Sequence, residues 1–163
     1  MTPFTRLLAF TFASMLAFQT GAAAPNCQLK DERVERAIAS VATELQGTEY
    51  CQFRRYLSLD DIDSDGKADF LVTFNVEGTG EGNGNDVVAY LMAFITSRTG
   101  KAPMRLEVGK RGTRLPNAIW FDGRDALIGF VRWLDSDASC CPSGNEKRRY
   151  VITRDTIVEK REQ

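Results

Sequence analysis

The fold of this protein is decided by residues 56–76, which read YLSLDDIDSDGKADFLVTFNV. Two apolar segments, Tyr56–Leu59 and Phe70–Val76, flank an acidic turn in this stretch. Short runs rich in β-branched and aromatic residues, bounded by Asp, Ser and Gly, are typical of neighbouring strands. We therefore expect a strand–turn–strand unit here, and the acidic turn between its strands is the most specific local signal in the chain.

Carboxylates occur at the first, third, fifth and ninth positions of this turn, and Gly66 occupies the sixth. Calcium is a hard cation that takes several oxygen ligands at once, and glycine permits the sharp turn that brings such ligands together. The main-chain carbonyl of residue 67 can add a further oxygen. The expected calcium ligands are, in chain order, Asp61, Asp63, Asp65, Lys67 and Asp69.

The turn matches only the first half of an EF-hand loop. Its twelfth position is Val72, where an EF-hand has a bidentate Glu, and the flanking segments are strand-like rather than helical. The turn resembles instead the calcium loop of FG-GAP and related β-propeller repeats, in which an Asp-rich turn joins two strands. The alternative is an acidic turn without metal, in which Asp and Gly serve the turn geometry alone.

Outside this unit, the chain contains one clear helix pattern and several strand patterns. Residues Asp31–Gln46 carry an apolar stripe at helical spacing, and Gly47 favours a helix end after them. Further short strands are expected at Val87–Ile95, Arg105–Val108, Ala118–Phe121, Ala126–Trp133, Arg149–Thr153 and Thr156–Glu159. The predicted fold class is α+β, with one N-terminal helix packed on a mostly antiparallel sheet of about seven or eight short strands.

The order of motifs resembles that of a group of small exported bacterial proteins, which includes the LppP/LprE-type lipoproteins of mycobacteria. The shared features are the acidic turn, the Gly-rich segment Gly78–Gly84, the motif Cys140-Cys141-Pro142-Ser143 and a final Tyr-bearing strand. This chain lacks the lipid-attachment Cys of those lipoproteins. The resemblance covers most of the chain after residue 23, and it implies an exported domain with a single-blade, FG-GAP-like fold.

The N-terminal segment has the order of a secretory signal peptide, with Arg6 followed by the apolar run Leu7–Phe18 and then by small residues. Gly21 and Ala23 suit a cleavage site, so we expect removal of residues 1–23 and one domain over residues 24–163. The apolar run is too short to cross a bilayer, which takes roughly 20 apolar residues. We therefore expect a periplasmic or secreted protein.

All four cysteines, Cys27, Cys51, Cys140 and Cys141, lie in the part that we expect to be exported. An even number in an oxidising compartment predicts disulfides and no free thiol. Because a bridge between adjacent residues closes a strained ring, we favour pairings in which Cys27 and Cys51 each bind one member of the Cys140–Cys141 pair. Zinc is disfavoured, because the chain has no CxxC spacing.

The chain contains no histidine, which excludes Ser–His–Asp and Cys–His nucleophile systems and zincin motifs. Its acids are densest in one tight loop, where they are too close together to straddle a sugar, so a carboxylate-based hydrolase is a less favoured alternative. A formal net charge of −1 provides no basic surface for nucleic acid. No stretch after the signal peptide is apolar enough to span a membrane.

These exclusions favour a non-enzymatic, exported protein that binds a protein partner. The candidate loops for that contact are Gly78–Gly84 and Ser136–Gly144. One concrete form of this hypothesis is an inhibitor or immunity protein that blocks a peptidoglycan (cell-wall) hydrolase. The alternative is a calcium-stabilised envelope domain without an inhibitory role.

Overall fold

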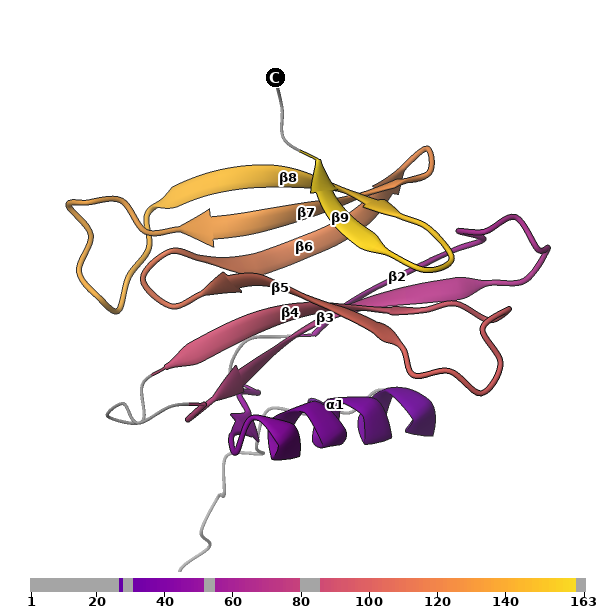
Figure 1. Cartoon of the computed structure of the whole chain (residues 1–163). Coiled ribbons are helices and arrows are strands. Elements are labelled where there is room, and N and C mark those ends of the chain that lie inside the picture. Colours follow the sequence, from indigo (N-terminus) through magenta and orange to yellow (C-terminus); the bar gives the residue numbers. More distant parts are fainter. Residues whose placement is uncertain (1–26, 28–30, 52–54, 80–85, 161–163) are drawn as a thin grey trace, which may run out of the picture.

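The computed structural model describes residues 27, 31–51, 55–79 and 86–160, and in these ranges the chain has an α+β fold (Figure 1). The predicted signal peptide and its cleavage site lie outside the described residues. The elements are α1 (Glu32–Glu44), β1 (Thr48–Glu49), β2 (Tyr56–Asp60), β3 (Asp69–Glu77), β4 (Val87–Phe94), β5 (Met104–Lys110), β6 (Arg114–Asp122), β7 (Asp125–Arg132), β8 (Gly144–Ile152) and β9 (Ile157–Lys160).

Helix α1 forms where the apolar stripe predicted it. Asp31 is its N-cap, and the side chain of Asp31 accepts a hydrogen bond of 2.9 Å from the main-chain N–H of Arg33. The helix ends before Gln46, which adopts a positive φ of 55°. Gly47 follows at the predicted helix stop, and its main-chain N–H donates to the carbonyl of Ala42 at 2.9 Å. A Cβ atom at Gly47 would lie 2.4 Å from the carbonyl oxygen of Glu77. The glycine therefore lets the chain after α1 pass close to β3.

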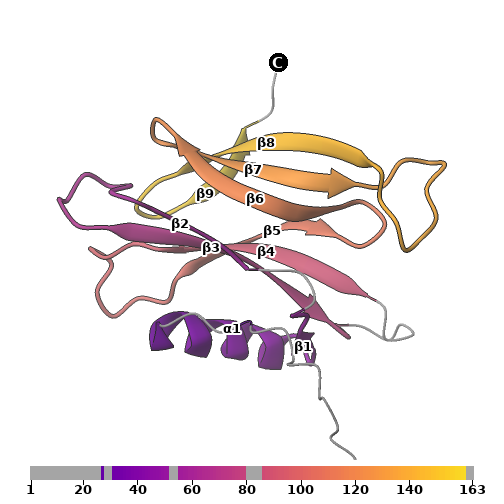
Figure 2. The same ribbon diagram turned by 180° about the vertical axis from the view of Figure 1, so that it is seen from behind.

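The nine strands form one antiparallel sheet in the order β1-β3-β4-β5-β6-β7-β8-β9, with β2 also paired to β3. Strands β1 and β2 share one edge of β3, since Glu49 pairs with Val76 and Tyr56 pairs with Thr73. The ladder narrows between β5 and β6 to the single pair Lys110 and Arg114. At this point the sheet bends, so that β6–β9 form a second layer over β2–β5 and α1 covers the opposite face of β3 and β4 (Figures 1 and 2).

The core has two parts, one on each side of β3 and β4. Apolar residues of α1, including Val34 and Ile38, pack with Val72 and Phe74 of β3. On the other face, a larger cluster lies between the two sheet layers and includes Leu71, Leu91, Phe130 and Tyr150. Residues 69–76 of β3 are all buried, because α1 covers one face of this strand and the second sheet layer covers the other. Three of these buried residues are polar, namely Asp69, Thr73 and Asn75.

All eight sequence-predicted strands are present, and β1 is an additional strand of two residues. Two strands extend well beyond the predicted bounds. Strand β6 begins at Arg114 and contains a register shift between Pro116 and Ala118, and β8 begins at Gly144. The extension of β8 carries Gly, Asn and charged residues, and the extension of β6 contains Pro116 beside its register shift, so neither continued the apolar strand pattern. Among the described residues, no helix is long and apolar enough to cross a membrane.

Candidate functional site

The acidic turn joins β2 to β3, and the pair Asp60 and Asp69 closes its base. Local hydrogen bonds shape the turn. The two carboxylate oxygens of Asp61 accept the main-chain N–H groups of Asp65 (3.0 Å) and Gly66 (2.9 Å). Gly66 has a φ of 82°, which glycine adopts without strain. The turn therefore has the sharp geometry that its sequence predicted.

Three of the predicted ligands lie together. Carboxylate oxygens of Asp61, Asp63 and Asp65 lie within 4.8 Å of one another. The hydroxyl of Ser97, from the connection after β4, donates to Oδ2 of Asp63. Oδ1 of Asp63 is buried and has no hydrogen-bond partner within the described ranges. Three carboxylates with a spare buried oxygen suit a hard cation such as calcium, which takes carboxylate, carbonyl and water oxygens.

Asp69 lies apart from this group, which we call the acidic triad (Asp61, Asp63 and Asp65). Its side chain is fully buried, and both carboxylate oxygens accept main-chain N–H groups, from Ile62 (3.0 Å) and Thr96 (2.6 Å). Thr96 also donates its hydroxyl to the carbonyl of Ala68, at 2.8 Å. Asp69 therefore fastens the acidic turn to the β4–β5 connection. Lys67 is exposed and donates its main-chain N–H to Asp65, at 2.9 Å.

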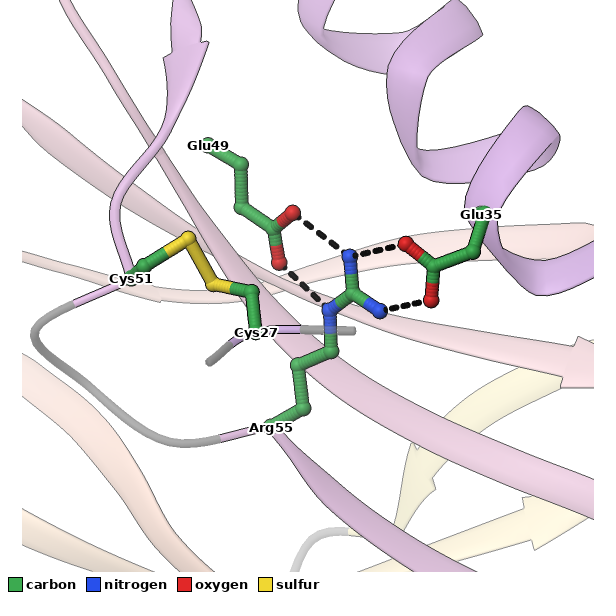
Figure 3. The surroundings of a disulfide bond; sticks show 5 residues. All are labelled: Cys27, Glu35, Glu49, Cys51 and Arg55. Atoms are coloured by element: carbon green, nitrogen blue, oxygen red, sulfur yellow. Dashed lines mark hydrogen bonds and ion pairs between the residues drawn. A yellow bond between two sulfur atoms is a disulfide. The ribbon is translucent and has the colours of Figure 1, made fainter. Parts of the chain in front are cut away.

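The disulfide pairing differs from the prediction. Cys27 bonds to Cys51, with Cα atoms 5.4 Å apart, and Cys140 bonds to its neighbour Cys141. The expectation that Cys27 and Cys51 each pair with a member of the second motif is therefore wrong. The physical reason is the layering of the fold. Cys27 and Cys51 lie beside α1 and β1, whereas Cys140 and Cys141 lie in a loop of the opposite layer (Figures 1 and 3).

That loop, residues 133–143, connects β7 to β8, and we call it the Cys-Cys loop. It projects beyond the ends of both strands (Figure 1). Asp137 orders it from within, because its carboxylate accepts the main-chain N–H groups of Leu134 (2.7 Å) and Ser143 (2.9 Å) and the Ser143 hydroxyl (2.6 Å). These donors hold the pKa of Asp137 below its ordinary value. The loop is thus ordered without being buried.

The outer surface of the Cys-Cys loop combines polar and apolar groups. Cys140 and Cys141 are both exposed, and the side chain of Leu134 is 38% exposed. Gly144 follows the loop and lies close to the side chain of Leu134. A Cβ atom at Gly144 would lie only 2.9 Å from Cδ2 of Leu134, so a larger residue would crowd this contact. The other predicted presenting loop, Gly78–Gly84, lies mostly outside the described residues. Gly78 itself has a positive φ of 74°.

Sequence reasoning missed Ser97 and Asp137. Ser97 lies 34 residues after Asp63 in the chain, and no local sequence pattern predicts a contact over that distance. Asp137 did carry a signal, because an Asp followed by Ser and Pro within a short loop favours side-chain bonds to nearby main-chain N–H groups.

Comparison of the chain with protein-family models, with curated proteins and with solved structures finds no significant match.

Proposed function

We propose that this chain is an exported, non-enzymatic domain that binds a protein partner through the Cys-Cys loop. The observation that carries the proposal is the internal order of this projecting loop. A segment that Asp137 and the Cys140–Cys141 bond hold in one conformation loses little conformational entropy when it binds. Exposed Leu134 offers an apolar contact at its base. A peptidoglycan hydrolase is the candidate partner, and the chain then acts as its inhibitor or immunity protein.

Two observations support a role without catalysis. The sequence contains no histidine. Among the described residues, each carboxyl whose pKa is shifted has a lowered pKa, at Asp31, Glu44, Asp137 and Glu146, and burial raises the pKa of Tyr150. General acids and bases work best with a pKa near the operating pH, and all of these shifts move away from neutrality. The missing histidine and the direction of these pKa shifts therefore favour a binding role over acid–base catalysis.

The proposal is tested by inhibition of exported amidases and muramidases acting on purified peptidoglycan. We expect the protein to slow one of them in a dose-dependent way. Leu134→Lys should weaken that inhibition at least tenfold, because it places a charge in the buried contact. Leu57→Lys is the matched control, since Leu57 is 44% exposed on β2, away from the loop. Equal potency of the two variants, or no inhibition by the wild type, contradicts the proposal.

A second candidate role, calcium binding, rests on the acidic triad and on the resemblance of the turn to FG-GAP calcium loops. Asp61, Asp63 and Asp65 would hold the ion, with the main-chain carbonyl of Lys67 as a further ligand. Bound calcium would offset the repulsion among three carboxylates and tie β2 to β3. Because Asp69 is already committed to main-chain donors, the ligand set is incomplete, and a dissociation constant of roughly 10⁻⁴–10⁻³ M is expected.

Thermal melting in chelator, calcium and magnesium tests this role. A few millimolar calcium should raise the melting temperature of the wild type by mass action, and magnesium should raise it less. Asp63→Asn combined with Asp65→Asn should abolish the calcium effect. If the wild type melts at one temperature in all three solutions, the turn serves geometry alone.

A further inference from the structure

The two disulfides of this protein differ in their access to solvent. Cys140 and Cys141 are both exposed, in the Cys-Cys loop that projects beyond the ends of β7 and β8 (Figure 1). Cys27 and Cys51 are half-buried and lie beside Arg55 (Figure 3). Thiol–disulfide exchange begins when a thiolate from another molecule reaches a sulfur atom, so exposure favours reaction at the adjacent pair.

The two bonds also differ in how far the fold protects them from reduction. A disulfide that stabilises the folded state is itself stabilised by folding to the same extent, because the two equilibria are linked. Cys27 and Cys51 are 24 residues apart, so their bond closes a loop of the chain and gains this protection. Cys140 and Cys141 are neighbours, and their bond closes no loop beyond its own ring. Folding therefore protects the first bond and leaves the second open to reduction.

The frame of the Cys-Cys loop does not depend on its disulfide. Asp137 accepts the main-chain N–H groups of Leu134 and Ser143, which lie on either side of the cysteine pair. Between these two points, the N–H of Cys141 donates to the carbonyl of Ala138 at 3.0 Å. None of these hydrogen bonds uses a sulfur atom. Opening the disulfide therefore leaves the frame in place, and the two thiols stay close enough to re-form the bond.

We propose that the Cys140–Cys141 pair is a redox-active site whose substrate is a protein dithiol of the same compartment, and that Cys27–Cys51 is a structural bond. All four cysteines of the chain are disulfide-bonded, so the reductant must be a separate molecule. The site lies in the loop for which we propose a partner contact, but its chemistry depends neither on that contact nor on calcium.

The reaction is a two-step exchange. A thiolate of the dithiol attacks one sulfur of the adjacent pair, which breaks the disulfide, forms a mixed disulfide and releases the other cysteine as a thiolate. The second thiolate of the dithiol then attacks its own partner sulfur in the mixed disulfide and releases the remaining cysteine. Two electrons and two protons pass to Cys140 and Cys141, and the dithiol becomes a disulfide.

Equilibration of the folded protein with mixtures of reduced and oxidised dithiothreitol tests the difference between the two bonds. Alkylation followed by peptide mass spectrometry counts the free thiols at each cysteine. We expect Cys140–Cys141 to be half-reduced at a ratio of reduced to oxidised reagent that is lower by roughly tenfold or more than the ratio for Cys27–Cys51. Equal ratios, or earlier reduction of Cys27–Cys51, overturn the proposal. Free thiols at Cys140 and Cys141 in protein purified without a reductant also overturn it.

The same assay with reduced thioredoxin as the probe tests the class of substrate. We expect this protein dithiol to reduce Cys140–Cys141 and to leave Cys27–Cys51 intact, because only the first pair is exposed in a projecting loop. Reduction by dithiothreitol but not by thioredoxin overturns the assignment of a protein substrate.

Amide NMR spectra of the two redox states test whether the reaction stays local. We expect changes at residues 138–141, while the signals of the core are retained. Asp137→Ala should let the changes spread over the whole Cys-Cys loop, because it removes the acceptor shared by both ends of the loop. Asp135→Ala, at an exposed carboxylate of the same loop, is the matched control and should behave as the wild type. Loss of the folded spectrum on reduction overturns the proposal, and identical changes in the two variants overturn the role of Asp137.

Discussion

At the scale of single residues, the carboxylate of Asp69 holds the acidic turn against the neighbouring connection of the sheet. It is fully buried, and it accepts N–H groups from two segments that are far apart in the chain, at Ile62 and Thr96. An amide in its place has only one acceptor oxygen. Its NH₂ group would face a main-chain N–H, and one buried donor would lose its partner.

We predict that Asp69→Asn lowers the free energy of unfolding by about 2 kcal/mol, because a buried donor is left unsatisfied. The loss should be the same in chelator and in calcium. Urea denaturation measures it, and Asp65→Asn, at an exposed carboxylate, should cost less than about 0.5 kcal/mol in chelator. If Asp69→Asn is neutral in chelator and removes only the calcium effect, Asp69 is a metal ligand rather than a structural one.

At the scale of elements, Arg55 joins α1 to β1 just before β2 begins. It donates to Glu35 of α1 and to Glu49 of β1, and its side chain is only 4% exposed (Figure 3). Desolvation opposes the charged form, but hydrogen bonds to Glu49 and Glu35 outweigh it and raise the pKa of Arg55. The Cys27–Cys51 disulfide lies beside this cluster and ties the same elements covalently.

Arg55→Met should therefore destabilise the protein by about 3–5 kcal/mol, because it removes the positive charge that Glu35 and Glu49 share. Replacing Glu35 and Glu49 by Gln in the same chain should restore part of the loss. Arg36→Met is the matched control, since its ion pair with Glu32 is exposed and is worth less than about 1 kcal/mol. Chemical denaturation of the wild type, the two single variants and the triple variant measures the free energy of unfolding of each. Equal losses of stability in Arg55→Met and Arg36→Met would contradict this prediction.

The two disulfides should contribute unequally to stability. Cys27 and Cys51 are 24 residues apart, and in the chain-entropy model a loop of this size contributes about 3.5 kcal/mol. Cys140 and Cys141 are adjacent, so their bond restrains only the loop that contains them. We predict that replacing Cys27 and Cys51 by Ser lowers the melting temperature, whereas the same change at the adjacent pair leaves it nearly unchanged. A large drop in the second variant would show that the Cys-Cys loop supports the core.

At the scale of the whole molecule, Arg114 connects the two sheet layers where the ladder between β5 and β6 is shortest. It donates to the carbonyl of Val108 in β5 (2.7 Å), to Glu146 in β8 (2.9 Å) and to Glu159 in β9 (2.8 Å). Desolvation raises the pKa of Glu146, but hydrogen bonds from Arg148 and Arg114 outweigh it, and the net pKa is lowered. Charge-assisted bonds thus replace missing strand pairing at the bend.

A carboxyl whose folded-state pKa is lowered stabilises the fold above its unfolded-state pKa, which is roughly 4.3 for Glu. That contribution is lost as the pH falls through the folded-state pKa. We predict that the wild type loses stability below about pH 5, and that Glu146→Gln is about 2 kcal/mol less stable at pH 7. The difference between them should shrink in acid. Urea denaturation from pH 7 to pH 3 measures this, with the exposed Glu107→Gln as control, and a constant difference at every pH is the contrary outcome.

Local patterns determined much of this protein. The apolar stripe predicted α1, because its period is set within one helix. Part of each of the eight longer strands was also readable, since turn residues separate short runs of strand-forming side chains. The acidic turn is equally local. Asp61, Asp63 and Asp65 converge because Gly66 and nearby main-chain bonds bend a segment of a few residues.

Tertiary structure alone decided the features that depend on segments far apart in the chain. The layers place Cys27 beside Cys51 and keep both from Cys140, although spacing favoured the opposite pairing. Asp69 is a structural residue because folding brings the main-chain N–H of Thr96 to its carboxylate. A sequence pattern cannot distinguish this structural role from metal binding.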